Sequence, residues 1–274
     1  MAETRFRSIV DQPAPMHLDI GVPHIARVYD YCLGGTNNFA ADRAAAEEFV
    51  QAMPGILTAV RSARAFLVRA VWFLAADCGI RQFLDIGTGL PTANNTHQVA
   101  QQAAASSRIV YVDNDPMVLA HARALLTSSR EGATAYIDAD LRNVDEILEE
   151  ASYTLDFTRP IALMLIGVLH CIPDADDPYG IVRRLLAAVP PGSYLVVGHP
   201  ASDVEVEASA KATAGLNEKL AEPVTWRSQD QVARFMDGAA MLDPGLVHYS
   251  QWRPDPESPP AKPVPAWCAV ARKG

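Results

Sequence analysis

Two short motifs place acidic side chains and glycines where a nucleotide-like ligand could bind. The apolar run FLDI contains Asp85 near its end and is followed by Gly87 and Gly89, and the apolar run IVYV is followed by Asp113. Gly89 and Asp113 are 24 residues apart, which leaves room for one turn, one helix and a return strand. This is the layout of a nucleotide-binding βαβ unit, in which glycines let the backbone approach the ligand and an acid on the second strand binds ribose hydroxyls.

The chemistry of the first loop favours S-adenosylmethionine over a dinucleotide. A dinucleotide site has a third glycine, because a pyrophosphate must lie on the helix N-terminus. Here the loop continues with Leu90 and Pro91, and Pro91 has no N–H to donate. The carboxylate of Asp85 would repel a pyrophosphate, whereas it would attract the ammonium group of a methionine moiety. The Asp-x-Gly-x-Gly pattern after a strand resembles the first motif of class I methyltransferases.

A third acidic motif follows the next predicted strand. The segment 134–138 reads as a strand, and Asp140 and Leu141 come directly after it. By resemblance to methyltransferases, Asp140 would accept a hydrogen bond from the adenine amino group and Leu141 would flank the ring. Asp138 is the rival candidate, since strand alternation points it to the same side as Asp140. In a second interpretation, both aspartates only cap the turn before a helix predicted at 143–151.

The fourth motif is the almost unbroken apolar run at 161–174, which is typical of a central parallel strand buried on both faces. Ligands of open α/β sheets lie beyond the carboxyl ends of the strands, so the segment from Gly167 to His170 is expected to border the reaction site. His170, and His199 after the fifth predicted strand, are candidates for a general base. A lone histidine is more often structural, and the acidic loop at 174–177 is interpreted as a solvated turn rather than a metal site.

Composition excludes several classes of protein. The chain has 274 residues, a net charge of −9 and 49% hydrophobic residues, which fits one α/β domain with additions and argues against a nucleic-acid-binding face. The four cysteines are scattered without a Cys-x-x-Cys pair, so free thiols in a reducing compartment are expected. No signal peptide or membrane span is recognised, and a cytoplasmic location is expected by default.

The order of predicted elements indicates the fold. Strands alternate with helices from Arg81 onward, which predicts a Rossmann-like, doubly wound α/β fold with a mostly parallel, seven-stranded sheet. Its strands are expected near 81–86, 108–113, 134–138, 161–167 and 193–199, and segments 245–252 and 265–272 are expected to form an antiparallel C-terminal hairpin. Its helices are expected near 93–105, 116–128, 143–151, 178–189 and 229–238, with a further helical segment between residue 200 and Glu222.

An N-terminal extension precedes this pattern. Residues 1–22 are expected to form a poorly structured arm, and helices are predicted at 23–31, 41–53 and 57–76. The chain is therefore divided into an N-terminal arm and helical lid over 1–80 and a methyltransferase domain over 81–274, which together form one compact unit.

Beyond the general pattern, the chain resembles the DUF574 family of predicted class I S-adenosylmethionine-dependent methyltransferases. The resemblance is carried by ARVYDYCLGGTNNFAADR at 26–43, RQFLDIGTGLPT at 81–92 and VYVDNDPMVLAHARALL at 110–126, and it extends from Pro23 to Arg272. The element Y-D-Y-x-L-G-G-x-x-N-F is its most distinctive part. The resemblance implies the fold and the cofactor, and it does not imply a substrate.

The N-terminal element is expected to form a lid over the cofactor. Glycines permit close backbone approach, asparagine amides bind carboxylates, and an arginine pairs with them. The candidate lid residues are Arg27, Tyr29, Tyr31, Gly34, Gly35, Asn37 and Asn38. Tyr31 is also retained, with the two histidines, as a candidate catalytic residue. The alternative is that the two glycines only end a helix and that the tyrosines lie at the edge of the core.

These motifs together predict an S-adenosylmethionine-dependent methyltransferase that acts on a small-molecule acceptor. Asp85 and the Gly87-Thr88-Gly89 turn would hold the amino-acid end of the cofactor, and Asp113 would bind the ribose, with Asn114 beside the adenine. Asp115 is expected to cap the helix that begins at Pro116. Two other functions stay open at this point: a non-catalytic S-adenosylmethionine-binding protein, and, less favoured by the loop chemistry, a NAD-dependent oxidoreductase.

Overall fold

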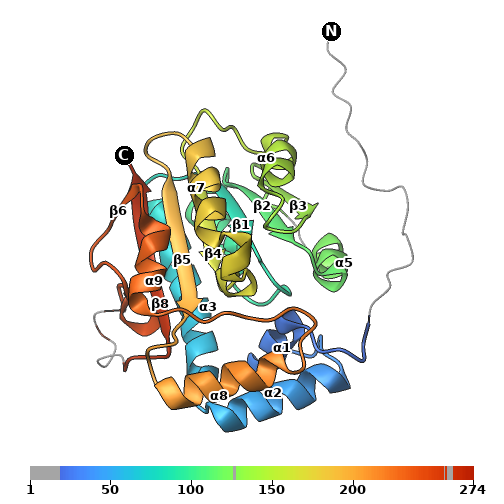
Figure 1. Ribbon diagram of the computed structural model, residues 1–274. Helices are drawn as coiled ribbons and strands as arrows, with labels where there is room; N and C mark the ends of the chain where they lie inside the picture. The colour runs from blue at the N-terminus through green and yellow to red at the C-terminus, as the bar shows by residue number, and fades with distance from the viewer. Residues whose placement is uncertain (1–18, 126–127, 256, 258–261) are drawn as a thin grey trace.

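The fold is a single twisted sheet covered by helices on both faces (Figure 1). The computed structural model describes residues 19–125, 128–255, 257 and 262–274, so most of the predicted N-terminal arm lies outside the described residues. The sheet order is β3-β2-β1-β4-β5-β8-β6, and β7 pairs with β8 off this path. The doubly wound, mostly parallel α/β prediction is therefore confirmed.

Five parallel strands form the centre of the sheet, and their carboxyl ends lie along one edge. They are β1 (Gln82–Ile86), β2 (Arg108–Asp113), β3 (Ala133–Asp138), β4 (Ala162–Ile166) and β5 (Tyr194–Pro200). The long antiparallel β8 (Ala266–Lys273) pairs with β5, and the short β6 (Ala239–Met241) forms the edge beyond it. β1 and β4 are buried along nearly their whole length, which explains their continuous apolar runs.

The C-terminal hairpin differs from the prediction in detail. Of the predicted strand 245–252, only β7 (Val247–His248) pairs with β8, and a 3₁₀ turn follows at Tyr249–Gln251. This turn directs Tyr249 and Trp252 into the core, where both rings contact Phe66 at centroid distances of 5.5 and 5.3 Å. Burial of these two large aromatic side chains shortens the predicted strand. The described sheet has eight strands instead of the predicted seven, because the short β6 also pairs with β8.

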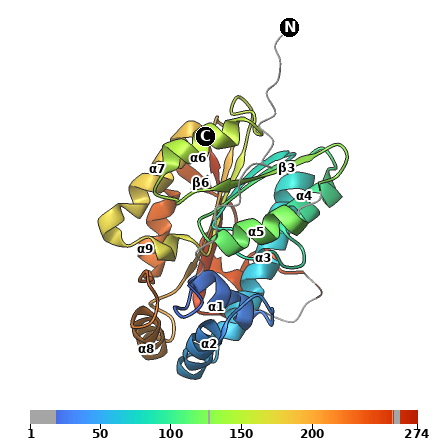
Figure 2. The same cartoon turned by 90° about the vertical axis from the view of Figure 1, so that its right-hand side faces the viewer.

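Helices cover both faces of the sheet (Figure 2). One face is covered by α3 (Ile56–Ala76), α4 (Thr96–Ala103) and α5 (Pro116–Leu125), and the other by α6 (Val144–Ser152), α7 (Pro178–Ala188) and α9 (Gln229–Ala233). No helix in the described ranges is long and apolar enough to cross a membrane.

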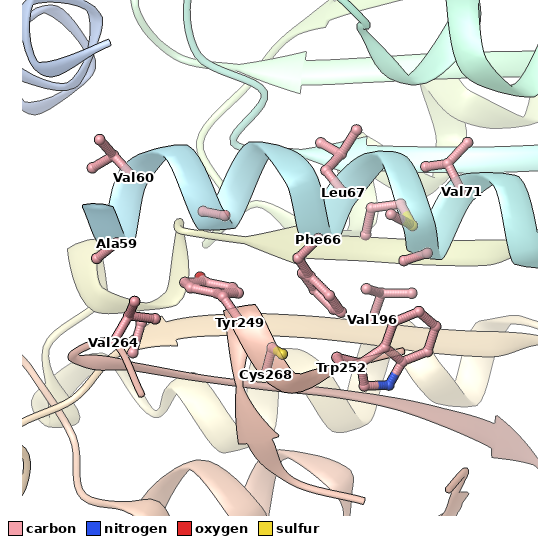
Figure 3. Packing of buried hydrophobic residues seen from close by; sticks show 14 of the residues in the cluster. Ala59, Val60, Phe66, Leu67, Val71, Val196, Tyr249, Trp252, Val264 and Cys268 are labelled. Carbon is pink, nitrogen blue, oxygen red and sulfur yellow. The ribbon is translucent and has the colours of Figure 1, made fainter. Parts of the chain in front are cut away.

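The helix α3 carries the largest part of the first core (Figure 3). Its apolar residues recur at helical spacing. Figure 3 shows Phe66 pointing toward Val196 and Trp252, whereas Leu67 and Val71 lie on the opposite side of the helix. Burial of each such side chain stabilises the fold by about 1.5–3 kcal/mol. Val196 of β5 and Cys268 of β8 belong to the same core cluster and lie on the side of the helix to which Phe66 points.

Three further helices lie beyond the carboxyl edge of the sheet. They are α1 (Ile25–Cys32), α2 (Ala40–Ala52) and α8 (Val206–Asn217). The views in Figures 1 and 2 place α2 and α8 side by side, although they come from opposite ends of the chain. The space between these helices and the strand ends is where a ligand of this fold would bind.

Candidate functional site

The loop after β1 is shaped by two left-handed glycines. Gly87 has φ of +72° and Gly89 has φ of +65°, conformations that other residues adopt at a cost. A Cβ atom added to Gly87 would lie 2.3 Å from Cβ of Val168, which follows β4. The Gly87 N–H donates to the Val112 carbonyl at 2.8 Å, and this bond folds the loop over the end of β2.

Asp85 lies at the base of this loop and is almost fully buried. Its Oδ2 accepts a 2.6 Å hydrogen bond from the Thr96 hydroxyl at the start of α4. Burial raises the pKa of Asp85 from 3.8 to about 6, and the hydrogen bond from Thr96 and the positive charge of Arg64 oppose this rise. Within the described ranges Asp85 has no charged hydrogen-bonding partner. A buried acid of this kind is well suited to pair with a cationic group of a ligand.

Asp113 connects the two predicted motifs directly. Its Oδ2 accepts a 2.8 Å hydrogen bond from the Gly89 N–H, and its Oδ1 accepts from the Asp115 N–H at 3.0 Å. Burial raises the pKa of Asp113. Asp115 accepts from the Met117 N–H at 2.8 Å and so caps α5, as predicted.

His24 also meets Asp115, with Nδ1 3.0 Å from Oδ2. Burial opposes ionisation of Asp115, but this imidazole and the other donors around the carboxylate leave its pKa below the usual value. Because His24 lies just before α1, the pair ties the N-terminal helices to the end of β2.

Arg142, in the loop after β3, contacts three acidic side chains. Its guanidinium lies 2.7 Å from Asp140 Oδ2 and 2.7 Å from Asp176 Oδ2, and 3.5 Å from Glu222 Oε2. The Asn114 side chain donates to the same Oδ2 of Asp140 at 3.1 Å. These contacts hold the loops after β2, β3 and β4 beside one another.

A buried arginine, Arg227, holds the loop after β4 in place by hydrogen bonds. Arg227 is fully buried, and its guanidinium donates to the carbonyls of Leu169 and Ile172 at 2.9 and 2.8 Å. It also lies 2.7 Å from Asp174 Oδ1 and donates to His199 Nε2 at 3.1 Å. Arg227 was not among the residues predicted from the sequence, because its neighbouring residues do not distinguish it from a surface arginine.

The histidine candidates have different surroundings. His199 Nδ1 donates to the Pro200 carbonyl at 2.8 Å and Nε2 accepts from Arg227, so both nitrogens are used and its role is structural. His170 borders the cavity, and its Nδ1 is buried without a hydrogen-bond partner among the described residues. Burial, together with the charge of Arg227, lowers the pKa of His170 to about 4, so the imidazole is neutral near pH 7.

A cavity of about 550 Å³ lies between the strand ends and the N-terminal helices, within the range of small-molecule sites. Most of the predicted cofactor residues line it: Arg27, Asp85, Gly87, Thr88, Gly89, Asp113, Asn114, Asp140, Leu141 and Gly167. Asp138, the rival of Asp140, is exposed and is not among the lining residues. Their roles toward a cofactor stay predictions.

The predicted lid residues Tyr31, Gly34, Gly35, Asn37 and Asn38 do not line the cavity. They form a loop that folds around the buried Asp30. The Asp30 carboxylate accepts from the Asn37 N–H at 2.9 Å and from the Asn38 side chain at 2.8 Å, and a Cβ at Gly35 would collide with it. The Tyr31 hydroxyl donates instead to Glu47 at the surface, at 3.0 Å. In this structure the motif serves to build the turn between α1 and α2.

Arg27 lines the cavity, but its guanidinium is bonded within the protein. Its Nε lies 3.1 Å from Asp42 Oδ2, and Nη2 donates to the carbonyls of Asp19 and Val22. Asp42 is also fully buried and accepts from the Phe39 N–H at the start of α2. The pair therefore joins the first two helices.

Arg64 is a cavity residue that sequence reasoning missed. It lies on α3, and Nη2 donates to the carbonyls of Ala93 and Asn94 at 3.1 Å each. Within the described ranges it forms no salt bridge, and its charge acts on Asp85. A helical arginine one residue after the apolar position Ala63 gave no signal, because helix periodicity places it only near the core face.

The S-adenosyl methyltransferase family matches residues 11–274, nearly the whole chain. The chain belongs to this family. The resemblance to DUF574 is confirmed, and with it the S-adenosylmethionine cofactor and the methyl-transfer function. No protein of curated function matches the chain.

Solved structures agree with the family assignment. A DUF574 family protein from Streptomyces avermitilis MA-4680 has a TM-score of 0.89 and 39% identity, over 93% of this chain and 99% of that one. A candidate methyltransferase from Thermobifida fusca YX has a TM-score of 0.85 and 39% identity, over 95% and 98%. An O-methyltransferase family protein from Burkholderia thailandensis, at 13% identity, 76% and 55% coverage and a TM-score of 0.51, shares the fold alone.

Proposed function

We propose that this S-adenosylmethionine-dependent methyltransferase binds its cofactor along the carboxyl edge of β1, β2 and β3 and methylates a small molecule in the same cavity. The observation that carries the proposal is the contact between Gly89 and Asp113, which brings a glycine loop and two buried acids to one wall of the cavity. The cofactor supplies a methyl group on a sulfonium. Transfer breaks the S–CH₃ bond, forms a bond from the methyl to the acceptor and leaves S-adenosylhomocysteine.

The ammonium and carboxylate groups of the methionine moiety would each pair with a side chain of opposite charge. Asp85 would pair with the ammonium group, and Arg64 would pair with the carboxylate. This replaces the prediction of Arg27 for the carboxylate, because the Arg27 guanidinium is already bonded to Asp42 and two carbonyls. Among the described residues, Arg64 donates only to the neutral carbonyls of Ala93 and Asn94, so a carboxylate would be a stronger partner.

The nucleoside end meets hydrogen-bond acceptors. Asp113 would accept from the ribose hydroxyls, because its two oxygens each receive one backbone N–H and retain further lone pairs. Asp140 is held at the cavity by Arg142 and Asn114, where it would accept from the adenine amino group beside Leu141. Four carboxylates on this wall, including Asp115, oppose a pyrophosphate, which disfavours NAD.

Methyl transfer then depends on position and on exclusion of water. Gly167, with φ of +76° and an open space at its missing side chain, allows close approach after β4. If a proton must leave the acceptor, His170 would accept it as a weak base, because the imidazole borders the cavity and is neutral near pH 7 with a pKa of about 4. The division into a lid over 1–80 and a domain over 81–274 is part of this proposal, with residues of α1, α2 and α3 as the part of the lid that borders the cavity.

A thermal-shift titration with S-adenosylmethionine, S-adenosylhomocysteine and NAD tests the site. Ligands that bind the folded state raise the melting temperature by mass action. We expect a rise with both sulfur ligands and none with NAD, and a smaller rise for Asp113→Ala. Asp138→Ala is the matched control, because Asp138 ends the neighbouring strand but is exposed outside the cavity. Equal shifts in the two variants would contradict the assignment of Asp113.

A further inference from the structure

The cavity has two chemically different ends. The carboxylates Asp85, Asp113 and Asp140 lie at the strand ends, whereas the opposite wall comes from the helices and from the chain after β5. That wall is built by apolar and aromatic side chains: Tyr29, Phe49, Ile56, Val60, Leu216, Leu220, Trp226 and Tyr249. These residues all belong to, or pack against, one hydrophobic core cluster.

Four aromatic rings give this apolar end its character. Phe49 of α2 and Trp226, which follows α8, meet edge to face with centroids 6.0 Å apart. The Tyr29 hydroxyl donates to the Val60 carbonyl at 3.3 Å, which fixes its ring against α3. Tyr249 packs on Phe66 behind the wall. Such rings favour another aromatic group in offset or edge contact.

Three charged side chains of the lining interact with other charged side chains and not with the apolar end. Glu222 lies beside Arg142, Arg64 acts on Asp85, and Arg27 is paired with Asp42. The apolar wall itself contributes no ionisable group except the two tyrosine phenols and the Cys32 thiol next to Tyr29. Burial raises the pKa of Tyr29 to about 12 and that of Cys32 to about 11, so all stay neutral near pH 7. A charged ligand group would lose its hydration here without compensation.

One polar atom marks where this end meets the strands. Tyr249 is 4% exposed, lines the cavity, and its hydroxyl has no hydrogen-bond partner in the described part of the chain. The hydroxyl approaches β5, because a Cβ added to Gly198 would lie 2.4 Å from it. Burial raises the pKa of Tyr249 well above its usual value, so the phenol keeps its proton and is available as a donor.

We propose that the apolar end is the acceptor subsite, that the acceptor is a neutral aromatic molecule, and that the Tyr249 hydroxyl is its polar contact. The inference rests on the proposed function, since the subsite is named by its place beside the cofactor wall. The proposed subsite gives the helices α2 and α8 a role in binding the acceptor. The motifs at the strand ends do not give these helices a role.

The test uses 1-naphthol as a neutral aromatic probe and 1-naphthalenesulfonate as the same ring with a fixed charge. Both are titrated by fluorescence into the full chain, with and without saturating S-adenosylhomocysteine. We expect 1-naphthol to bind at least tenfold more tightly than the sulfonate and to bind together with S-adenosylhomocysteine. Displacement of S-adenosylhomocysteine by 1-naphthol, or tighter binding of the sulfonate, would overturn the inference.

Three variants locate the probe. Leu220→Asp places a charge on the wall and is expected to weaken 1-naphthol binding at least tenfold, whereas Val206→Asp, at a residue of α8 that is 60% exposed, should leave it unchanged. Tyr249→Phe removes one hydroxyl and should weaken 1-naphthol binding about fivefold, without loss of the fold. Equal binding in all three variants would overturn the inference.

A separate readout distinguishes the two proposals. Each variant is also tested for stabilisation by S-adenosylhomocysteine, which depends on the strand-end wall. If S-adenosylhomocysteine stabilises the protein but 1-naphthol does not bind, the proposed acceptor subsite is wrong and the proposed cofactor site is unaffected. Absence of stabilisation in the wild type would remove the proposed function itself, whatever the probe does.

Discussion

The backbone N–H of Gly89 donates a 2.8 Å hydrogen bond to Oδ2 of Asp113. This one contact joins the loop after β1 to the end of β2, so the glycine turn and the acid form a single structural unit. A change at either position should therefore alter both the ligand site and the stability of the loop.

The first prediction concerns the shape of this loop. Gly87→Ala should destabilise the protein by about 1–3 kcal/mol, because φ is +72° and the added Cβ would meet Val168 at 2.3 Å. Urea unfolding measures the free energy. Gly215→Ala is the matched control, since Gly215 lies within α8 with nothing near the added atom, and alanine there should be neutral or stabilising. Equal effects would show that the left-handed turn is not required.

The second prediction concerns pH. The pKa of Asp85 rises from 3.8 to about 6 on folding, so the folded state holds more protons between these values. The free protein should therefore lose stability as the pH rises through this window. Binding of S-adenosylhomocysteine should show the opposite trend and strengthen about tenfold from pH 5 to 7, because its ammonium group favours the ionised acid.

Isothermal titration of wild type and Asp85→Asn checks this pH dependence. The variant should bind S-adenosylhomocysteine more weakly at pH 7, and its affinity should change little between pH 5 and 7. A slope as steep as that of the wild type would assign the titration to another group. Asp138→Asn, at an exposed position, should keep the wild-type slope.

The third prediction concerns Arg64 of the cavity lining. Arg64→Gln should weaken binding of S-adenosylhomocysteine about tenfold or more, because a charged hydrogen bond to a carboxylate is lost. Arg61→Gln, at an exposed position one turn earlier on α3, should leave affinity unchanged. Tyr31→Phe should also be neutral, since the Tyr31 hydroxyl donates to Glu47 at the surface. A loss of affinity in Tyr31→Phe would restore the original lid prediction.

The fourth prediction concerns the buried guanidinium of Arg227. Arg227→Met should destabilise the fold by about 3–5 kcal/mol, because two buried carbonyls and His199 lose their donor and each unsatisfied buried group costs about 1–3 kcal/mol. Chemical denaturation measures this change. Arg184→Met breaks only an exposed pair with Asp145 and should cost less than about 1 kcal/mol. Similar values for the two variants would mean that Arg227 contributes no more than a surface residue.

The site residues that could be predicted from the sequence lie directly at the ends of strands. Asp85, Asp113 and Asp140 each come just before or after the end of an apolar strand, and parallel strands bring such ends to one edge, so their common place in the cavity could be predicted. The helix cap at Asp115 was predictable for the same reason, since it depends only on neighbouring residues.

The rest depends on long-range packing. The polar loop around Asp30 has the composition of a ligand site, but its hydrogen bonds are made within the loop, which composition does not reveal. Trp226 and Tyr249 reach the cavity only because α8 packs on α2 and because a turn interrupts the predicted strand at 245–252. Neither event has a local signature in the sequence.

The wall of the cavity has a consequence for synthesis of the protein on the ribosome. Its residues range from Asp19 to Ala266, and Ala266 begins β8, the strand that pairs with β5. The helices α1 and α2 are made before the strands, but the surface that they help to form exists only after β8 has been made. Ligands therefore meet a complete binding surface only after β8 has been synthesised, and they cannot guide the earlier steps of folding.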